Sequence, residues 1–176
     1  MNVSSLEDAV DEDAEDERIW KNSLNLIDEA CTEIRNVSHN MMPNVLIKSG
    51  LSQALRELAD KINAAGQLKV LLDAPPLNGN LDETTEVGIY RIVQEILNNT
   101  IKHSEASEAK ITCVEKMNSL LVQVKDNGKG IDLAKIKNSK GIGWKNIQSR
   151  VELLNGSLNI ETNKGTEVNI EVRLDT

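Results

Sequence analysis

The stretch YRIVQEILNNTIKH, residues 90–103, is the most informative segment of this 176-residue sequence. Its polar side chains recur at steps of four and three and therefore share one face of a helix: Arg91, Glu95, Asn99 and then Lys102 or His103. Apolar residues lie mostly on the other face, so we expect an amphipathic helix over residues 84–103. A solvated face more often carries Lys and Glu pairs, whereas this diverse row can hold a cation, a phosphate and a water.

Three shorter motifs follow this helix: DNGKGID at residues 126–132, KGIGWKNI at 140–147 and KGTEVNI at 164–170. Each has an ordinary structural explanation, because glycine beside a polar residue is typical of turns and hairpins. A glycine pair that enters a helix also suits a phosphate, which backbone N–H groups and the helix dipole attract. The motifs match neither the dinucleotide-binding fingerprint nor the Walker-type phosphate loop. Their distinctive residues are Asp126, Gly128, Gly130, Gly141, Gly143 and Thr166.

The segments around these motifs predict an α+β domain over residues 68–176. Helices are expected at residues 51–64, closed by Gly66, and at 144–154. Strands are expected at residues 68–72, 109–114, 120–126, 158–162 and 167–174. The last two alternate apolar and polar residues, as in a sheet that is wet on one face. Helices on the other face would complete a two-layer α/β sandwich.

The N-terminal part of the sequence has a different pattern. Apolar or small residues recur at steps of four and three from Trp20 to Met41, which predicts a long bundle helix up to a break at Pro43. Residues 7–17 hold eight of the 28 acidic residues and no basic one, so the formal charge of −8 belongs to this tail. We therefore expect an acidic, disordered stub at residues 1–17, a bundle helix at 18–48 and a linker helix at 49–67.

In their order and spacing, the four motifs together resemble the N, G1, G2 and G3 boxes of the GHKL, or Bergerat, ATP-binding fold. Histidine kinases, gyrase, MutL-type repair proteins and certain chaperones share this fold, and the match covers residues 68–174. The sequence is most similar to histidine kinases with a short ATP lid, such as the nitrate- and desaturase-regulating sensor kinases. Their second glycine box reads GxGLxNI, and Trp144 stands here in place of the usual leucine.

The resemblance implies a role for each residue that matches a family motif. Glu95 would be the general base that polarises the nucleophile or a water, and Asn99 would coordinate a Mg²⁺ ion that bridges the ATP phosphates. Asp126 would accept a hydrogen bond from the adenine amino group. The other positions would neutralise phosphate charge (Lys102 and His103), let the backbone pass close to the base (Gly128 and Gly130), form the lid hinge (Gly141 and Gly143) and close the adenine pocket (Thr166).

His39 lies in the heptapeptide VSHNMMP, residues 37–43, which resembles the phosphate-accepting segment of a histidine kinase. In these kinases an acidic residue generally follows the acceptor, and Asn40 cannot supply that charge. The 60 positions from His39 to Asn99 also leave no room for a second long antiparallel helix. The segment is more similar to the second dimerisation helix and linker of these kinases. We therefore expect the acceptor upstream of Met1, and no autophosphorylation by this chain alone.

The resemblance implies the ATP-binding catalytic region of a sensor histidine kinase, which transfers the γ-phosphoryl group of ATP to a histidine for relay to a response regulator. The expected partners are ATP, Mg²⁺, the response regulator and a second copy of the kinase through its helical bundle. The alternatives are a GHKL ATPase, or a nucleotide-dependent interaction module without histidine phosphotransfer. No basic patch or aromatic platform favours nucleic acid.

Composition bears on location and on the core. Cys31 and Cys113 lie far apart with no metal-site spacing, which is typical of a reduced, cytoplasmic protein. No apolar run approaches the ~20 residues of a membrane span, so we expect no membrane contact by this chain, although the full-length kinase could be membrane-anchored. Phenylalanine is absent and aromatic residues make up 2%, so the core is expected to be aliphatic.

Overall fold

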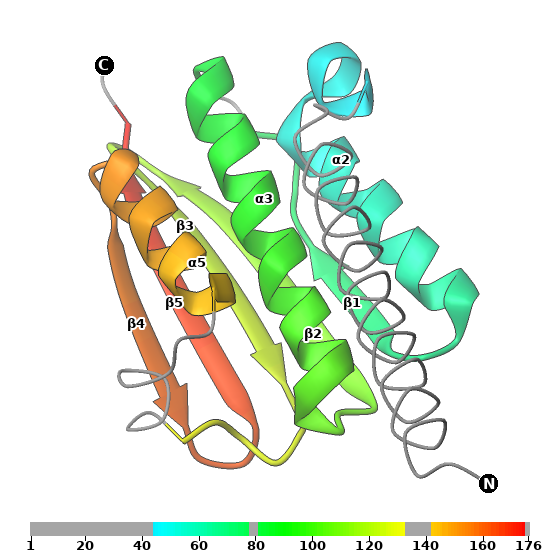
Figure 1. Ribbon diagram of the computed structural model, residues 1–176. Helices are drawn as coiled ribbons and strands as arrows, with labels where there is room; N and C mark the ends of the chain where they lie inside the picture. The colour runs from blue at the N-terminus through cyan, green and yellow to red at the C-terminus, as the bar shows by residue number, and fades with distance from the viewer. Residues whose placement is uncertain (1–43, 78–80, 133–141, 175–176) are drawn as a thin grey trace, which may run out of the picture. The chain divides into compact units, whose positions relative to one another are not determined.

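The computed structural model describes residues 44–77, 81–132 and 142–174 (Figure 1). Their centre is a sheet in the order β1-β2-β3-β5-β4. β1 pairs parallel with β2, and the other neighbours are antiparallel. The strands are β1 (Lys69–Asp73), β2 (Glu108–Lys116), β3 (Ser119–Asp126), β4 (Ser157–Thr162) and β5 (Thr166–Arg173). Each of them overlaps a strand predicted from the sequence.

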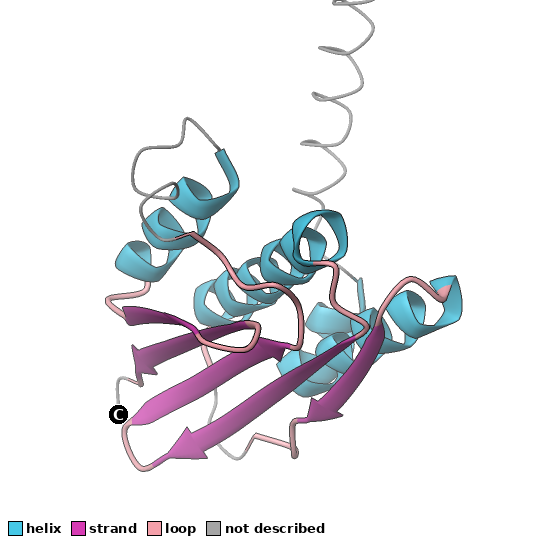
Figure 2. Cartoon of the chain, turned by 90° about the horizontal axis from the view of Figure 1, so that it is seen from below, coloured by secondary structure: helices cyan, strands magenta, loops and turns pink. Residues whose placement is uncertain are grey.

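The α-helices of the described residues all lie on one face of this sheet (Figure 2). They are α2 (Asn44–Ala65), α3 (Glu83–Asn99) and α5 (Ile142–Leu153), and a π-helix, η1 (Thr100–Ser104), continues α3. α3 crosses the middle of the sheet and packs against α2 on one side and α5 on the other (Figure 1). This arrangement is the two-layer sandwich of α+β class that the sequence predicts.

The core between the two layers is aliphatic, as the composition predicts. Within the described residues, Tyr90 is its one aromatic member. Full burial of one such aliphatic side chain stabilises the fold by about 1.5–3 kcal/mol, so the sum over the interface holds the helices on the sheet. The largest fully buried side chains include Leu55, Ile89, Ile92, Leu97, Ile111, Leu120, Ile147 and Ile170. α3 therefore has a fixed position over the sheet, and the polar residues of its other face are fixed with it.

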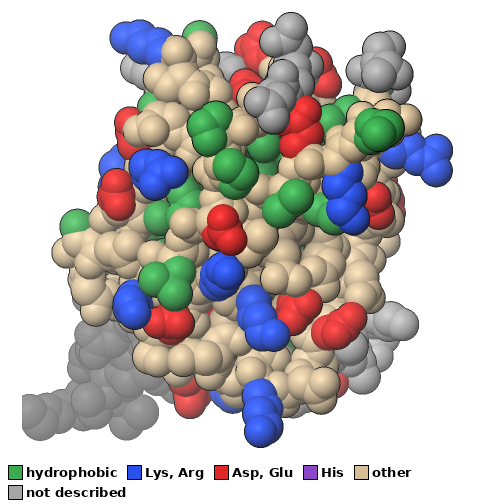
Figure 3. Space-filling model, turned by 180° about the vertical axis from the view of Figure 1, so that it is seen from behind, with side chains coloured by type: hydrophobic (Ala, Val, Ile, Leu, Met, Phe, Trp, Pro, Cys, Tyr) green, Lys and Arg blue, Asp and Glu red, His purple; other side chains and the backbone are tan. Residues whose placement is uncertain are grey.

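The opposite face of the sheet is open to solvent, and charged and hydrophobic side chains are mixed on it (Figure 3). Gln123 of β3 donates hydrogen bonds to Glu167 (2.9 Å) and Asn169 (2.8 Å) of β5. Lys125 forms an ion pair with Glu167 at 2.8 Å. Exposed ion pairs of this kind contribute about 0–1 kcal/mol each. The backbone hydrogen bonds between the strands therefore stabilise this side of the sheet, and its side chains are hydrated. The alternation in the sequence thus separates a helix-covered face from a wet one.

α2 is longer than the helix predicted at residues 51–64, because residues 44–49 are helical as well. Gly50 divides the two parts with φ 72° and ψ 179°, a backbone conformation that favours glycine. At the start of the second part, the backbone N–H of Leu51 donates to the Glu86 carboxylate of α3 at 3.0 Å. This contact satisfies one of the N–H groups that a helix start leaves unpaired. Its partner lies 35 positions away, so helix-start patterns in the sequence do not reveal it.

Most of the predicted N-terminal organisation lies outside the described residues. This applies to residues 1–17, to His39 and to the bundle helix up to residue 43. The end of the second helix is observed as predicted, because Gly66, with φ 72°, follows the last residue of α2. Within the described ranges, no helix is both long and apolar enough to cross a membrane.

Candidate functional site

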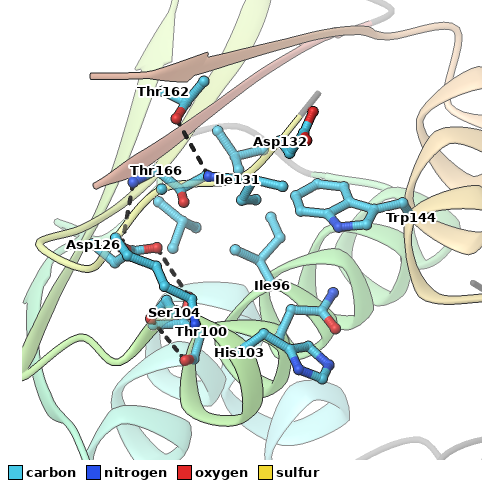
Figure 4. A pocket seen from close by; sticks show the side chains of 15 residues that line it. Ile96, Thr100, His103, Ser104, Asp126, Ile131, Asp132, Trp144, Thr162 and Thr166 are labelled. Atoms are coloured by element: carbon cyan, nitrogen blue, oxygen red, sulfur yellow. Dashed lines mark hydrogen bonds between the residues drawn. The ribbon is translucent and has the colours of Figure 1, made fainter. Parts of the chain in front are cut away.

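A pocket of about 790 Å³ opens at the end of the sheet where β3 and β5 meet η1 (Figure 4). α3 and η1 form one wall, the loop after β3 forms a second, and Trp144 in the first turn of α5 forms a third. Ile96, Val124 and Val168 make much of the lining apolar, and polar side chains gather at the floor. Such a concave, mostly apolar site with a few convergent polar groups is typical of small-molecule binding.

Asp126, the last residue of β3, lies at the floor of the pocket with 6% of its surface exposed. One carboxylate oxygen accepts from the backbone N–H groups of Gly128 (2.8 Å) and Thr166 (3.3 Å), and the other accepts from the Thr100 hydroxyl (3.4 Å). These neutral donors hold the carboxylate in place without using all of its acceptor capacity. A fixed acceptor at the bottom of an apolar pocket suits a ligand that brings a hydrogen-bond donor.

Two buried polar atoms of the pocket have no hydrogen-bond partner within the described residues: the Thr166 hydroxyl oxygen and the Asn99 amide nitrogen. Buried polar atoms are nearly always paired, and an unpaired one costs about 1–3 kcal/mol. Thr166 lies at the floor beside Asp126, whereas Asn99 is on the α3 wall. The residues present therefore fit a ligand with polar groups at two separate places, as a nucleotide has.

Gly128 and Gly130 shape the loop that follows β3. A Cβ at Gly128 would collide with the backbone oxygen of Ser104, and one at Gly130, where φ is 78°, would lie 2.5 Å from the Thr162 hydroxyl. The loop is tied to η1 by a backbone hydrogen bond to Ser104 (2.9 Å), and to β4 by the bond from Ile131 N–H to the Thr162 hydroxyl (3.3 Å). Glycine at both positions lets the loop pass between these elements, and Gly130 itself lines the pocket.

The helix with the polar row widens at its end. Residues 100–104 form the π-helix η1, whereas the sequence predicted a regular α-helix to His103. The Ser104 hydroxyl donates to the Thr100 carbonyl (2.8 Å) and accepts from the Ala106 N–H (3.1 Å). Side-chain bonds of this kind compete with the regular backbone ladder, and π-turns frequently occur at functional sites. In this arrangement Thr100 and His103 both line the pocket.

Glu95 and Asn99 meet the first turn of α5. A Cβ at Gly143 would lie 2.5 Å from a carboxylate oxygen of Glu95 and 3.4 Å from the amide nitrogen of Asn99. The missing side chain at Gly143 therefore allows the two helices to approach each other here. N–H groups at a helix start carry partial positive charge, which favours a carboxylate or a phosphate beside them.

The other residues predicted for the site are placed less centrally. His103 lines the pocket and is exposed, whereas Lys102 is exposed and does not line it. Gly141 lies outside the described residues. Arg91, the first member of the polar row, is buried, and its guanidinium donates to the Gln94 side chain (2.8 Å). It does not line the pocket.

Sequence reasoning missed several residues of the pocket: Thr100, Ser104, Ile131 and Thr162. Thr100 lies in the apolar row of its helix, and a polar residue in such a row is a signal that could have found it. The others come to the pocket through the π-helix and the path of the loop after β3. Residue spacing along the sequence does not encode either feature.

Comparison with known proteins agrees with this geometry. Residues 84–176, more than half of the chain, match the family described as histidine kinase-, DNA gyrase B-, and HSP90-like ATPase. The chain belongs to this ATPase family, and the GHKL fold predicted from its motifs is confirmed. Membership of the family implies that the domain binds ATP.

Several histidine kinases are similar to the chain. The chain is 32% identical over 143 residues to the sensor histidine kinase ComP of Bacillus subtilis, an alignment that covers 80% of this chain and 19% of ComP. The chain therefore spans about a fifth of the length of that curated relative. The histidine kinase domain of the Erythrobacter litoralis EL346 blue-light activated histidine kinase is 28% identical, with TM-score 0.62 and coverage of 70% of this chain and 61% of that one. The Acinetobacter baumannii histidine kinase AdeS is 14% identical and shares the fold, with TM-score 0.64 and coverage of 89% and 84%.

Proposed function

We propose that this chain is the ATP-binding catalytic region of a sensor histidine kinase, which transfers the γ-phosphoryl group of ATP to a histidine for relay to a response regulator. The pocket floor carries the proposal, because the buried Asp126 carboxylate lies beside the unpaired Thr166 hydroxyl. Glu95 and Asn99 stand on α3 beside the start of α5. The similarity to ComP and to the blue-light activated kinase supports this function over that of a gyrase-type or chaperone-type ATPase.

The adenine base would bind at the floor. The Asp126 carboxylate would accept a hydrogen bond from the exocyclic amino group, and the Thr166 hydroxyl would gain the partner that it lacks. Adenine presents a donor at this position, whereas guanine presents a carbonyl oxygen, so a carboxylate favours adenine. Ile96, Val124 and Val168 would pack on the base through their apolar surfaces.

The phosphates would lie toward Asn99 and the first turn of α5. The Asn99 amide offers a neutral oxygen of the kind that Mg²⁺ accepts. In the described part of the chain, no group of three or more His, Cys, Asp or Glu residues could hold a metal ion. Mg²⁺ in such sites relies on phosphate oxygens as well as protein ligands, and it would neutralise phosphate charge when bound. His103 places an exposed imidazole on the same wall.

Glu95 would act as the general base, one helical turn before Asn99. Its carboxylate lies beside Gly143, so the start of α5 limits the positions that it can adopt. From there it would accept the proton on the ring nitrogen of the acceptor histidine that does not attack. The unprotonated nitrogen would form the new N–P bond as the bond from the γ-phosphorus to the bridging oxygen breaks and ADP leaves. Accepting this proton prevents positive charge from building up on the imidazole.

The same proposal covers the setting of the domain. Residues 18–48 would be the second helix of a dimerisation bundle, residues 49–67 the linker, and residues 1–17 the stub of the preceding helix. The whole kinase would act as a homodimer, use Mg²⁺, phosphorylate a response regulator and hold this region in the cytoplasm. The acceptor histidine would lie outside this chain, and His39 would not be phosphorylated.

Incubation with ATP labelled in its γ-phosphate tests the proposal. The protein as the cell makes it should acquire an acid-labile, base-stable phosphohistidine, and Asn99→Ala or Glu95→Gln should each slow labelling by about a hundredfold or more. Asn98→Ala is the matched control, because Asn98 is a half-buried residue of the same helix outside the pocket lining. The chain of residues 1–176 should bind ATP without label on His39. ATP hydrolysis without labelled protein would contradict the proposal and favour the GHKL ATPase alternative. ATP binding with neither hydrolysis nor labelled protein would favour an interaction module.

A further inference from the structure

Trp144 forms the part of the pocket wall that lies across from the buried floor. It belongs to the first turn of α5, and its indole points into the pocket toward Ile131 and Ile96 (Figure 4). Asp126 lies on the other side of the same pocket (Figure 4). A ligand held by Asp126 would therefore have the indole across from it. A leucine at this position would have a smaller face and no polar atom.

The indole of Trp144 has both a free surface and a free hydrogen-bond donor. The residue is half-buried, and within the described residues its N–H forms no hydrogen bond. The nitrogen lies on the edge of the ring toward His103 rather than toward Thr162 (Figure 4). On the wall that contains His103, the amide nitrogen of Asn99 also lacks a partner. Two unpaired donors thus border the end of the pocket away from its floor, where an anionic group would pair with them.

We propose that Trp144 is a nucleotide-binding residue of the site, an inference that rests on the proposed function. Its aromatic face covers the base and ribose of ATP on the side opposite Asp126. Its N–H donates to a phosphate oxygen at the end of the pocket near Asn99. An aromatic side chain gains more from contact with a base than an aliphatic one, because base and indole both have π-faces. Trp144 thus contributes both cover and a phosphate contact, and leucine can supply only part of the cover.

Calorimetric titration of the chain with Mg²⁺-ATP tests this inference. Trp144→Leu should weaken ATP binding about tenfold. Trp144→Phe keeps an aromatic face and loses the N–H, so its ATP affinity should lie between those of the wild type and the leucine variant, whereas its affinity for adenosine should equal that of the wild type. Leu153→Ala is the matched control, because Leu153 is on the same helix, 79% exposed and outside the lining. Its ATP affinity should be unchanged.

The emission of Trp144 gives a second readout. In a Trp20→Phe background Trp144 is the only tryptophan, and its emission should change with the same midpoint as the calorimetric titration. Equal ATP affinity in the wild type and Trp144→Leu would overturn the inference and leave the proposed function intact, as would unchanged emission at saturating ATP. Failure of the wild type to bind ATP would overturn the proposed function and this inference together.

Discussion

The Asp126 carboxylate and the backbone N–H of Thr166 form a hydrogen bond of 3.3 Å between the end of β3 and the start of β5, while the hydroxyl of the same threonine is buried without a partner. The backbone N–H of Thr166 therefore helps to fix the Asp126 carboxylate. The Thr166 hydroxyl forms no hydrogen bond within the described residues. This division suggests that the hydroxyl serves a ligand rather than the fold.

Replacing Thr166 with valine tests this division. Valine keeps the shape of threonine and removes the hydroxyl, so the thermal midpoint should not fall. The ATP affinity should fall about fivefold, or about 1 kcal/mol, because one hydrogen bond to the ligand is lost. Calorimetry and thermal unfolding measure the two effects separately. Thr166→Ser keeps the hydroxyl and should bind ATP like the wild type. A valine variant with lower stability and unchanged ATP affinity would assign the hydroxyl to the fold.

Gly143→Ala should bring a methyl group against the Glu95 carboxylate, from which it would lie 2.5 Å. We expect a loss of about 1–3 kcal/mol in unfolding free energy from this overpacking. In a Glu95→Ala background the same substitution should instead stabilise α5 by about 0.5–1 kcal/mol, the ordinary gain of alanine over glycine in a helix. Urea unfolding of the four chains forms a double-mutant cycle. Equal effects of Gly143→Ala in both backgrounds would show that the two residues do not interact.

The contact between Glu86 and Leu51 should hold the start of the second part of α2 against α3. Glu86→Ala leaves the Leu51 N–H unpaired and should destabilise the chain by about 0.5–2 kcal/mol, the usual effect of losing a helix cap. Glu86→Gln keeps an oxygen acceptor and should lose less. Glu83→Ala, at an exposed position in the same turn of α3, is the control. Urea unfolding that gives equal losses for the alanine and glutamine variants would contradict this role.

Asp82 predicts a dependence of stability on pH. Its carboxylate accepts from the Thr85 hydroxyl (2.6 Å) and the Thr85 N–H (2.9 Å), and these hydrogen bonds lower the pKa of Asp82. Because the folded-state pKa is below the unfolded one, the stabilisation is present at higher pH and is lost as the pH falls through the folded-state pKa. Asp82→Asn keeps an N-cap oxygen but removes the negative charge at the start of α3, so it should destabilise the chain by about 0.3–1 kcal/mol at neutral pH. That difference should shrink below about pH 4. A difference that stays constant down to acidic pH would exclude the charged cap.

Cys113 should be chemically inert in the folded chain. Burial, with a smaller effect from Glu115, raises the pKa of its thiol to about 11. The reactive thiolate is therefore scarce at pH 8, and the side chain is inaccessible. In a Cys31→Ser variant, a thiol reagent should label the protein only as fast as it unfolds. Rapid labelling under native conditions would show that the core between β2 and the helices opens locally.

Residue periodicity was sufficient to predict the helix at residues 84–103 and its polar face, because burial on a sheet imposes a repeat that a single sequence shows. The same reasoning failed at the end of this helix. There the Ser104 hydroxyl bonds the Thr100 carbonyl, and a π-helix replaces the last α-turn. In α2 it assigned residues 44–48 to the end of the bundle helix and did not predict the kink at Gly50, because the kink depends on a glycine conformation and on a distant carboxylate.

The candidate site follows the same division between local and distant interactions. Asp126, Gly130 and Thr166 were predicted from motifs and converge on one pocket in the structure. Thr162 reaches that pocket only because the loop after β3 turns back to β4, a contact between residues 31 positions apart. Lys102 and His103 are adjacent in sequence, yet only His103 lines the pocket. The direction of a side chain at a helix end depends on the backbone, which spacing alone does not determine.

Titration of the chain with ATP and with GTP tests the central claim most directly, because it measures whether the Asp126 carboxylate recognises adenine. The wild type should bind one ATP with Mg²⁺ and prefer ATP to GTP, whereas Asp126→Asn should bind ATP about tenfold or more weakly and lose most of that preference. Asp60→Asn changes an exposed carboxylate of α2 outside the pocket lining and should behave like the wild type. Unchanged ATP affinity in Asp126→Asn, or equal affinity of the wild type for ATP and GTP, would contradict the account.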